Sequence, residues 1–224
     1  MKYKYFYSKN IHKFTLILLH GMNMNITTLY KTIRRLQYYN KNLKIILPIA
    51  DKMNINWPDG IEYNISSWYN YYTRYDNLFK HDNININDFE KQTNNIYHLL
   101  DKEISILENP KHIIIAGISQ GGTLAFNVGI NYKYKLAGII SIHSIFMNNV
   151  ILFKDNYNKI PVLLFSGSKD NIYNIKFQNK CLNYLREKKF KIFWEIENQL
   201  GHCKYSKNEF KFLNISINYL FKNC

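Results

Sequence analysis

Several residue types that mark other classes of protein are scarce in this chain of 224 residues. It contains 9 glycines and 4 prolines, too few for a collagen-like or linker-like sequence. The longest apolar run near the N-terminus, residues 14–19, is far too short to span a bilayer, and no small-residue cleavage site follows it. We therefore expect neither a membrane-spanning helix nor a signal peptide.

Cysteine is also scarce. The chain has three, Cys181, Cys203 and Cys224, an odd number without the spacing of metal ligands. This pattern fits a reduced compartment better than a disulfide framework. We therefore expect a cytoplasmic protein with no metal site.

Arginine accounts for only four of the 30 basic residues. The net charge of +14 would ordinarily suggest nucleic acid or an anionic membrane as a partner. The chain is rich throughout in Asn, Ile, Lys and Tyr, however, whose codons are A/T-rich, and arginine is the better reader of bases and phosphates. We predict no nucleic-acid partner, and peripheral contact with anionic membranes stays a hypothesis.

The remaining composition, 46% hydrophobic and 21% charged, is that of a globular protein, and the length fits a single domain over residues 1–224. Short β-branched runs alternate with longer amphipathic stretches, which predicts an α/β fold with a mostly parallel sheet and helices on both faces. Strands are expected at residues 14–19, 43–47, 112–116, 136–142, 161–165 and 191–196. Helices are expected at residues 26–38, 88–107, 120–130, 175–188 and 209–221.

Residues 48–85 follow neither pattern clearly. They contain the turn sequence Trp57-Pro58-Asp59-Gly60 and several alternating Asn–Ile pairs. We interpret this stretch as a long excursion with one short helix. Long loops that follow sheet strands often border a binding site.

The strand predicted before residue 117 runs directly into Gly117-Ile118-Ser119-Gln120-Gly121, a G-x-S-x-G sequence followed by a helical pattern. A serine at a sharp strand-to-helix turn is an accessible nucleophile, provided that the flanking residues are small enough for the backbone to fold back. The two glycines meet that need. The alternative is a glycine-rich strand–helix junction with an incidental serine.

A nucleophile of this kind is followed along the chain by an acid and then by a histidine. Asp170 follows the strand at residues 161–165, and His202 is the only histidine after it. Both are expected at the carboxyl edge of the sheet, where functional groups of open α/β sheets collect. The alternative role for Asp170 is that of a turn or cap residue, and the alternative for His202 is that of a solvated surface residue. Among the other histidines, His143 is the closest competitor, and we interpret it as part of the pocket wall.

Acyl transfer builds negative charge on the former carbonyl oxygen, which two fixed backbone N–H groups stabilise. The residue after the nucleophile, Gln120, is expected to supply one of them. The second is expected from the loop after an early strand, most simply from Met22 in Leu19-His20-Gly21-Met22. The alternative for His20-Gly21 is a plain strand-end turn.

Together these segments resemble the phospholipase/carboxylesterase group of α/β-hydrolases, which includes the acyl-protein thioesterases. Leu18-Leu19-His20-Gly21 is similar to the family's L-H-G segment, Ser67-Trp68-Tyr69 to its S-W-Y-D, and residues 117–122 to its G-F-S-Q-G-G. The segment from Pro161 to Asp170 is similar to the family segment that carries the acid. Gly201-His202 is similar to the family segment that carries the histidine. The resemblance implies an α/β-hydrolase fold with Ser119, His202 and Asp170 as nucleophile, base and orienting acid, Met22 and Gln120 as oxyanion donors, and no cofactor.

The chain departs from the family pattern at Asn23-Met24, Asn70, Ser166 and Ile172-Tyr173, none of which is a triad position. These departures concern the substrate. Trp68, Tyr69, Phe146 and Met147 are candidates for an acyl pocket, with simple core packing as the alternative. We expect a serine hydrolase that cleaves carboxylic esters or thioesters on acylated small molecules, lipids or proteins. A lysophospholipase-type enzyme and a non-catalytic binding protein of the same fold are the alternatives.

Overall fold

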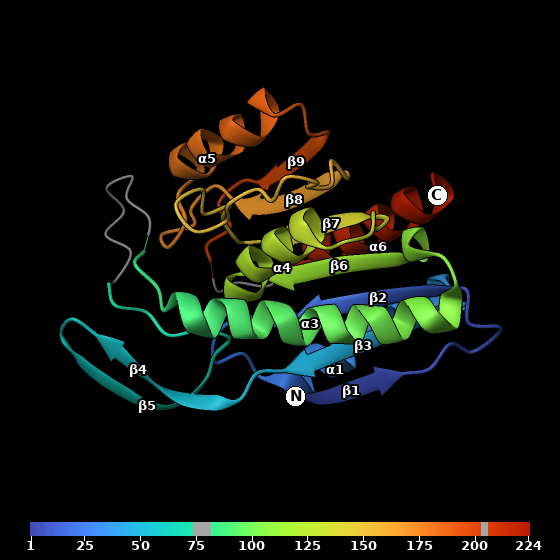
Figure 1. Cartoon of the computed structure of the whole chain (residues 1–224), viewed down its shortest axis with the longest axis horizontal. Helices are drawn as coiled ribbons and strands as arrows, with labels where there is room; N and C mark the ends of the chain where they lie inside the picture. The colour runs from blue at the N-terminus through green and yellow to red at the C-terminus, as the bar shows by residue number, and fades with distance from the viewer. Residues whose placement is uncertain (74–81, 203–205) are drawn as a thin grey trace.

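The computed structural model describes residues 1–73, 82–202 and 206–224, and in this part of the chain a seven-stranded sheet forms the centre of the molecule (Figure 1). The strand order is β1-β3-β2-β6-β7-β8-β9. Only β1 is antiparallel to its neighbour β3, and the other pairs are parallel, as the sequence predicts. The strands are β1 (Lys2–Phe6), β2 (Phe14–Leu19), β3 (Leu43–Ile49), β6 (Ile113–Ile118), β7 (Gly138–Ile142), β8 (Val162–Gly167) and β9 (Ile192–Glu197).

Helices cover both faces of the sheet. The helices α3 (Ile86–Leu107), α4 (Gln120–Asn131) and α5 (Ile175–Glu187) pack on the face seen in Figure 1. On the other face lie α1 (Ile26–Ile33), α2 (Leu36–Tyr39) and α6 (Lys207–Lys222). Each face has its own hydrophobic cluster, because successive side chains of a strand point to opposite sides of the sheet.

The start and the end of the long helix α3 are determined by its sequence. Asn85 caps its start by accepting a hydrogen bond from the Asp88 N–H, and the helix ends at Glu108, which has the left-handed φ of 56°. A buried ion pair of 2.6 Å between Glu103 Oε1 and Lys44 Nζ joins α3 to β3. The helix is therefore fixed at its carboxyl half by charge as well as by apolar packing.

Two predicted segments differ from the structure. Residues 26–38 form two helices, α1 and α2, because the chain turns at Arg34 and Arg35. Residues 48–85 hold an antiparallel hairpin, β4 (Lys52–Trp57) and β5 (Gly60–Ser66), and the expected short helix is absent from the described part of this stretch. The alternating Asn–Ile pairs have the period of a strand, and Gly60, with φ of 145°, makes the turn.

Two further boundaries were not predicted. The strand β1 was missed because its alternating Lys and Tyr residues are those of a half-exposed edge strand and form no apolar run. His112 ends a short 3₁₀ helix, Pro110–His112, and β6 begins one residue later.

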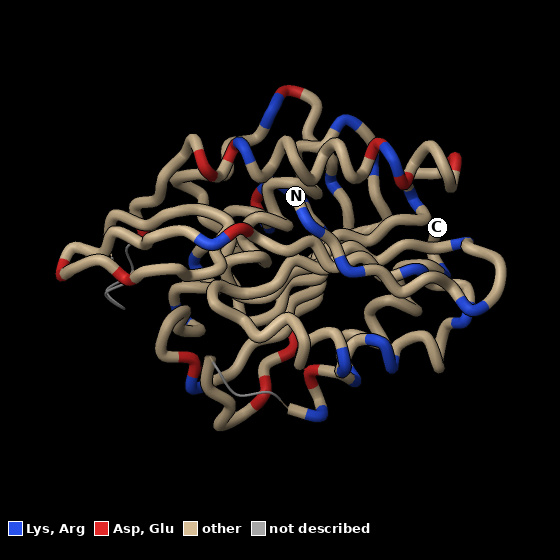
Figure 2. Tube along the Cα trace, turned by 90° about the horizontal axis from the view of Figure 1, so that it is seen from below, with Lys and Arg blue, Asp and Glu red and all other residues tan. Residues whose placement is uncertain are grey.

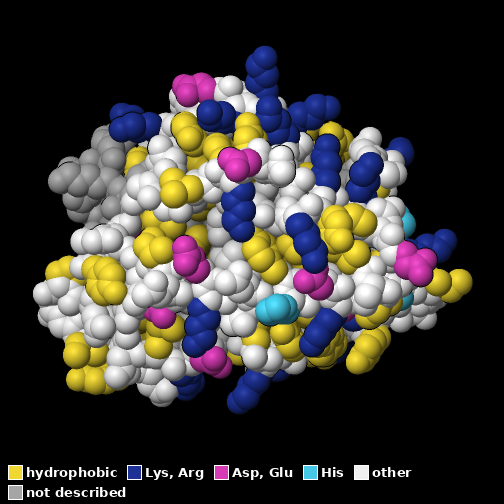
Figure 3. Space-filling view, viewed as in Figure 1, with side chains coloured by type: hydrophobic (Ala, Val, Ile, Leu, Met, Phe, Trp, Pro, Cys, Tyr) yellow, Lys and Arg dark blue, Asp and Glu magenta, His cyan; other side chains and the backbone are white. Residues whose placement is uncertain are grey.

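Most charged residues are exposed, and Lys44, Glu103, Asp170 and Glu209 are among the buried ones. In the trace of Figure 2, the positions of Lys, Arg, Asp and Glu lie mainly on helices and loops, and the central strands carry few of them. On the face shown in Figure 3, lysines and arginines are interspersed with acidic and hydrophobic side chains. None of the helices described is long and apolar enough to cross a bilayer.

Candidate active site

Ser119 lies at the turn between β6 and α4, with φ of 51° and ψ of −119°. This strained conformation is held by a hydrogen bond from Ser119 N–H to the carbonyl of Ile142 (2.8 Å) and by two close backbone approaches. A Cβ at Gly117 would overlap the Gly121 carbonyl, and a Cβ at Gly121 would overlap the His20 carbonyl. The two glycines of the G-x-S-x-G sequence are therefore required by the turn itself.

The structure brings the side chains of Ser119, His202 and Asp170 into one hydrogen-bonded chain. The distance from Ser119 Oγ to His202 Nε2 is 2.9 Å, and the distance from His202 Nδ1 to Asp170 Oδ2 is 2.8 Å. With the proton on Nδ1, the imidazole donates to the carboxylate and accepts from the serine hydroxyl. The three residues come from loops after β6, β8 and β9, so the parallel sheet places them at one edge.

Asp170 is buried and its two oxygens have separate partners. Oδ1 accepts hydrogen bonds from the N–H groups of Ile172 (2.9 Å) and Tyr173 (2.8 Å), which leaves Oδ2 for His202. Burial alone would raise the pKa of Asp170, but the neighbouring imidazoles of His143 and His202 and the backbone donor outweigh it and lower the pKa to about 2. The carboxylate is therefore ionised at neutral pH.

His143 lies beside this chain of residues. Its side chain is buried, with Nδ1 at 3.8 Å from Asp170 Oδ2 and Nε2 at 3.5 Å from Glu209 Oε2. Burial lowers the pKa of His143, but the two carboxylates raise it more strongly, to about 9. The imidazole is consequently protonated at neutral pH, and it compensates for the buried charge of Glu209.

The N–H of Gln120 is free of any helical partner, because it belongs to the first turn of α4. Met22 lines the same cavity as Ser119, and in the described part of the chain its N–H has no hydrogen-bond partner. His20 fixes the loop before Met22: its Nδ1 donates to the Gly21 carbonyl (2.7 Å), and its Nε2 accepts from Ala50 N–H (3.0 Å). Burial lowers the pKa of His20, which favours the neutral imidazole, and these two partners select the tautomer with the proton on Nδ1.

The side chain of Gln120 joins the nucleophile turn to the segment at residues 67–69. Its Oε1 accepts from Trp68 N–H (2.9 Å), and its Nε2 donates to Ser67 Oγ (2.8 Å) and to the Tyr69 carbonyl (2.9 Å). The indole N–H of Trp68 in turn donates to the His20 carbonyl (2.7 Å). Hydrogen bonds therefore connect three segments that are far apart in the sequence: the start of α4, residues 67–69 and the end of β2 at His20.

None of the four residues expected to line an acyl pocket lines the cavity beside Ser119. Trp68 and Tyr69 have no exposed surface, and Phe146 and Met147 are buried in the cluster that includes α4 and α5. The cavity itself, of about 310 Å³, is lined by the loop after β2, Ile118, Ser119, His143, His202 and Glu209. The Trp68 side chain is held inside by its indole hydrogen bond to the His20 carbonyl, and the Tyr69 ring packs against Phe89.

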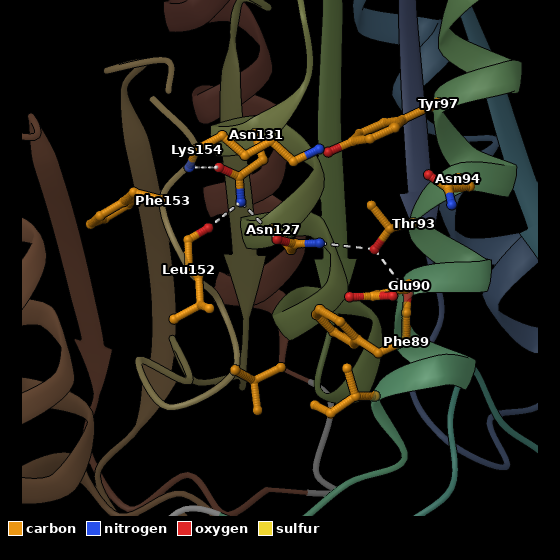
Figure 4. A pocket seen from close by; sticks show the side chains of 12 residues that line it. Phe89, Glu90, Thr93, Asn94, Tyr97, Asn127, Asn131, Leu152, Phe153 and Lys154 are labelled. Carbon is orange, nitrogen blue, oxygen red and sulfur yellow. Dashed lines mark hydrogen bonds between the residues drawn. The ribbon is translucent and has the colours of Figure 1, made fainter. Parts of the chain in front are cut away.

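A separate hollow lies between α3, α4 and the loop before β8 (Figure 4). It measures about 370 Å³ and shares no lining residue with the cavity at Ser119. Asn127 donates to Thr93 Oγ1 (2.9 Å), and Asn131 donates to Asn127 Oδ1 (2.8 Å) and to the Leu152 carbonyl (2.9 Å). These amides hold the loop to α4, which gives them a structural role.

The fold and the arrangement of the site define the class of protein. The mostly parallel sheet, covered on both faces and carrying a serine at the β6–α4 turn, is the α/β-hydrolase fold. The model of the phospholipase/carboxylesterase family matches residues 7–220, and the chain therefore belongs to this family of hydrolases.

Curated relatives carry esterase and thioesterase names. The chain is 24% identical to acyl-protein thioesterase 1 of Cryptococcus neoformans over 80% of its own length and 76% of that protein. It is 29% identical to acyl-protein thioesterase 1 homolog 2 of Dictyostelium discoideum, over 76% of each chain. The chain is also 29% identical to acyl-protein thioesterase 1 of Neurospora crassa. This match spans 47% of this chain and 45% of that protein, which is less than half of its length.

Solved structures show the same fold. The crystal structure of Arabidopsis thaliana SOBER1 superposes with a TM-score of 0.79 at 21% identity, covering 93% of this chain and 99% of that one. Acyl-protein thioesterase 2 of Zea mays superposes with a TM-score of 0.77 at 17% identity, covering 98% of both chains. At these identities the likeness concerns the fold alone.

Proposed function

We propose that this protein is a serine hydrolase that cleaves carboxylic esters or thioesters through an acyl-serine intermediate. The observation that carries the proposal is the continuous chain of hydrogen bonds from Ser119 Oγ through His202 to Asp170, at 2.9 Å and 2.8 Å. Membership of the phospholipase/carboxylesterase family and the names of the relatives support the same reaction class.

In the acylation step, His202 Nε2 takes the proton of the Ser119 hydroxyl while the oxygen attacks the acyl carbon. The negative charge moves to the former carbonyl oxygen, where the N–H groups of Met22 and Gln120 would each lower the barrier by about 3 kcal/mol. When the bond to the leaving alcohol or thiol breaks, the imidazolium returns its proton to that group. Asp170, which is ionised at neutral pH, stabilises the imidazolium from the time it takes the serine proton until it releases a proton to the leaving group.

In the second step a water molecule attacks the acyl-serine. His202 again takes the proton, the oxyanion forms in the same place, and the ester bond to Ser119 breaks to release the acid. The serine recovers its proton from the imidazolium. No step needs a group other than water and the chain's own residues.

The direct test is a panel of acyl esters, acyl thioesters and lysophospholipids, assayed with the wild type and with Ser119→Ala. We expect kcat/KM of the variant to fall by at least about 10⁴-fold on every substrate that the wild type turns over, because the nucleophile is lost. Turnover retained by Ser119→Ala would refute the proposal. The comparison of substrates also separates an ester or thioester hydrolase from a lysophospholipase.

A non-catalytic binding protein of the same fold is the remaining alternative. It would turn over no member of the panel and would fail to react with a fluorophosphonate probe. The free N–H groups at Met22 and Gln120 favour a catalyst, because they are aimed at no acceptor in the described part of the chain.

We further propose that residues 1–224 form one domain that acts in the cytoplasm. The family match spans residues 7–220 and one sheet joins both halves of the chain, which supports the single domain. Cys181 and Cys224 carry free thiols, which supports a reducing compartment. We expect one cooperative unfolding transition, coincident when followed by two spectroscopic probes, and activity that is unchanged in the presence of a reductant.

A further inference from the structure

His143 is a second imidazole beside the proposed base, and it has no role in the proposed reaction. It directly follows β7, and its backbone has the left-handed φ of 46°, which is uncommon for a residue other than glycine. Its N–H donates to the carbonyl of Phe165 in β8 (2.8 Å). The side chain lines the cavity that contains Ser119 and His202. The fold therefore holds a second imidazole at a fixed place among the catalytic groups.

Titratable groups face His143 from three other parts of the fold. Its Nδ1 lies 3.8 Å from Asp170 Oδ2, in the loop after β8, and its Nε2 lies 3.5 Å from Glu209 Oε2, in α6. The ring centre of His202, in the loop after β9, lies 6.0 Å from that of His143. The other residues that line the cavity carry no charge, and Phe165 packs edge-on against the imidazole. His143 therefore lies between two carboxylates and close to the proposed base.

The surroundings of His143 favour its charged form. Both imidazole nitrogens and Glu209 Oε2 are buried, and none of them has a hydrogen-bond partner in the part of the chain that the structure describes. A neutral imidazole would turn a lone pair towards one carboxylate and would leave the buried charge of Glu209 uncompensated. The protonated imidazole presents an N–H to each carboxylate instead. Although burial lowers the pKa of His143, the two carboxylates raise it to about 9.

A positive charge at His143 influences the protonation of His202. The base accepts the serine proton only while it is neutral, and the ionised Asp170, bonded to it at 2.8 Å, favours its protonated form. The charge of His143 opposes that protonation, because it repels a second imidazolium and compensates part of the charge of Asp170. Even at an effective dielectric constant of about 20, two charges about 6 Å apart interact strongly enough to move a titration by about one pH unit or more.

We propose that His143 is a positioning residue of the hydrolase, whose positive charge, acting through Asp170, keeps His202 neutral and able to accept the serine proton in mildly acidic solution. The inference rests on the proposed function and adds to it the pH range in which the base works. Glu209 provides the opposite charge that allows His143 to stay protonated inside the site. No bond forms or breaks at His143 itself.

The test is the pH dependence of kcat/KM for p-nitrophenyl acetate, between about pH 4 and about pH 9. His143→Gln keeps a polar side chain at this place and removes the charge. The acidic midpoint of the profile should move upward by about one pH unit or more, because the imidazolium of His202 then forms more easily. A purely structural role of His143 would lower the rate at every pH and leave the midpoint in place.

His112→Gln is the matched control, because His112 is a half-buried histidine at the opposite end of β6 from Ser119. Its midpoint should equal that of the wild type. His143→Lys restores a positive charge, and the double variant His143→Gln/Glu209→Gln removes a negative charge together with the positive one. In both, the midpoint should return towards that of the wild type. Midpoints are compared over the pH range in which circular dichroism shows each variant to be folded.

A second measurement needs no variant. In the wild type, the NMR signals of the His143 imidazole should show it protonated at neutral pH and should titrate near pH 9. A neutral His143 at pH 7 would overturn the inference. So would an acidic midpoint that is equal in the wild type and His143→Gln, or a shift that persists in both His143→Lys and the double variant, because such a shift would not follow the charge.

The two proposals fail in different ways. If the wild type cleaves the ester in a Ser119-dependent manner and the midpoint does not depend on the charge at position 143, the role of His143 is refuted and the hydrolase stands. If the wild type cleaves no ester and no thioester, both are refuted.

Discussion

At the scale of single residues, the site combines groups whose charges are fixed by burial and by their neighbours. Asp170 is ionised, with a pKa of about 2, and His143 is protonated, with a pKa of about 9. The imidazolium of His143 lies between the buried carboxylates of Asp170 and Glu209, and Asp170 also accepts the hydrogen bond of the proposed base His202. The sequence does not predict this arrangement, because Glu209 and His143 belong to segments that only the folded chain brings together.

The raised pKa of His143 makes stability depend on pH. A pKa raised in the folded state means that folding favours the protonated imidazole, so this contribution is fully present below pH 6.5 and is lost as the pH rises through about 9. In Glu209→Gln one of the two carboxylates that raise the pKa is removed. We expect the wild type to lose more thermal stability than this variant between pH 6.5 and about 9.

The measurement is the midpoint of thermal unfolding as a function of pH for both proteins. Parallel curves over the whole range would contradict the account, because they would mean that Glu209 does not influence the protonation of His143.

At the scale of elements, the meeting of Ser119, His202 and Asp170 could be predicted from the sequence, whereas the burial of Trp68 and Tyr69 could not. Ser119, Asp170 and His202 each follow a strand of a parallel sheet, and such strands end at the same edge, so sequence order alone predicts that they meet. Trp68 and Tyr69 look equally suited to a pocket wall or to the core. Both side chains are buried, and the Gln120 side chain bonds their backbone, a contact across more than 50 residues that no local pattern reveals.

The strands show the same division. Those of the parallel sheet are apolar runs and were predicted, whereas β1 and the β4–β5 hairpin lie at the edge or outside the main sheet, and their exposed polar residues hide the strand pattern. The break between α1 and α2 was missed because the apolar positions continue across Arg34 and Arg35 at helical spacing.

The role of Gln120 leads to a prediction at this scale. Gln120→Ala removes three buried hydrogen bonds to residues 67–69 and leaves the Trp68 N–H without its acceptor, and we expect the free energy of unfolding in urea to fall by about 3 kcal/mol. Because the same contacts hold the loop before Met22 through Trp68, kcat of the folded variant should fall about tenfold or more.

Gln37→Ala provides the control. Gln37 is also buried, and its Nε2 donates to the carbonyls of Tyr7 (2.7 Å) and Leu43 (2.8 Å), far from Ser119 in the fold. This variant should lose comparable stability without a change in kcat. Equal effects of the two substitutions on kcat would show that Gln120 acts only through general stability.

At the scale of the whole molecule, the surface charge is the property that bears on possible partners. The net charge of +14 is spread over helices and loops, and the face in Figure 3 mixes both signs. A net positive charge of this size predicts weak, long-range attraction to an anionic membrane.

We therefore expect the protein to bind vesicles that contain anionic lipids in low salt and to leave them in high salt. Raising the ionic strength from about 0.01 M to about 1 M shortens the Debye length from about 30 Å to about 3 Å, which screens charges of this kind. Co-sedimentation with anionic and with neutral vesicles measures the effect. Binding that persists in high salt, or that is equal for neutral vesicles, would exclude an electrostatic role for the lysines.

The central claim is that Ser119 is a nucleophile activated by His202, and labelling of the serine tests this claim most directly. After reaction with a fluorophosphonate probe, peptide mass spectrometry should locate a single adduct on Ser119. The rate of labelling should fall at least about a hundredfold in His202→Ala, because the hydroxyl then lacks its base. An adduct on another residue, or equal labelling rates in the wild type and His202→Ala, would contradict the account.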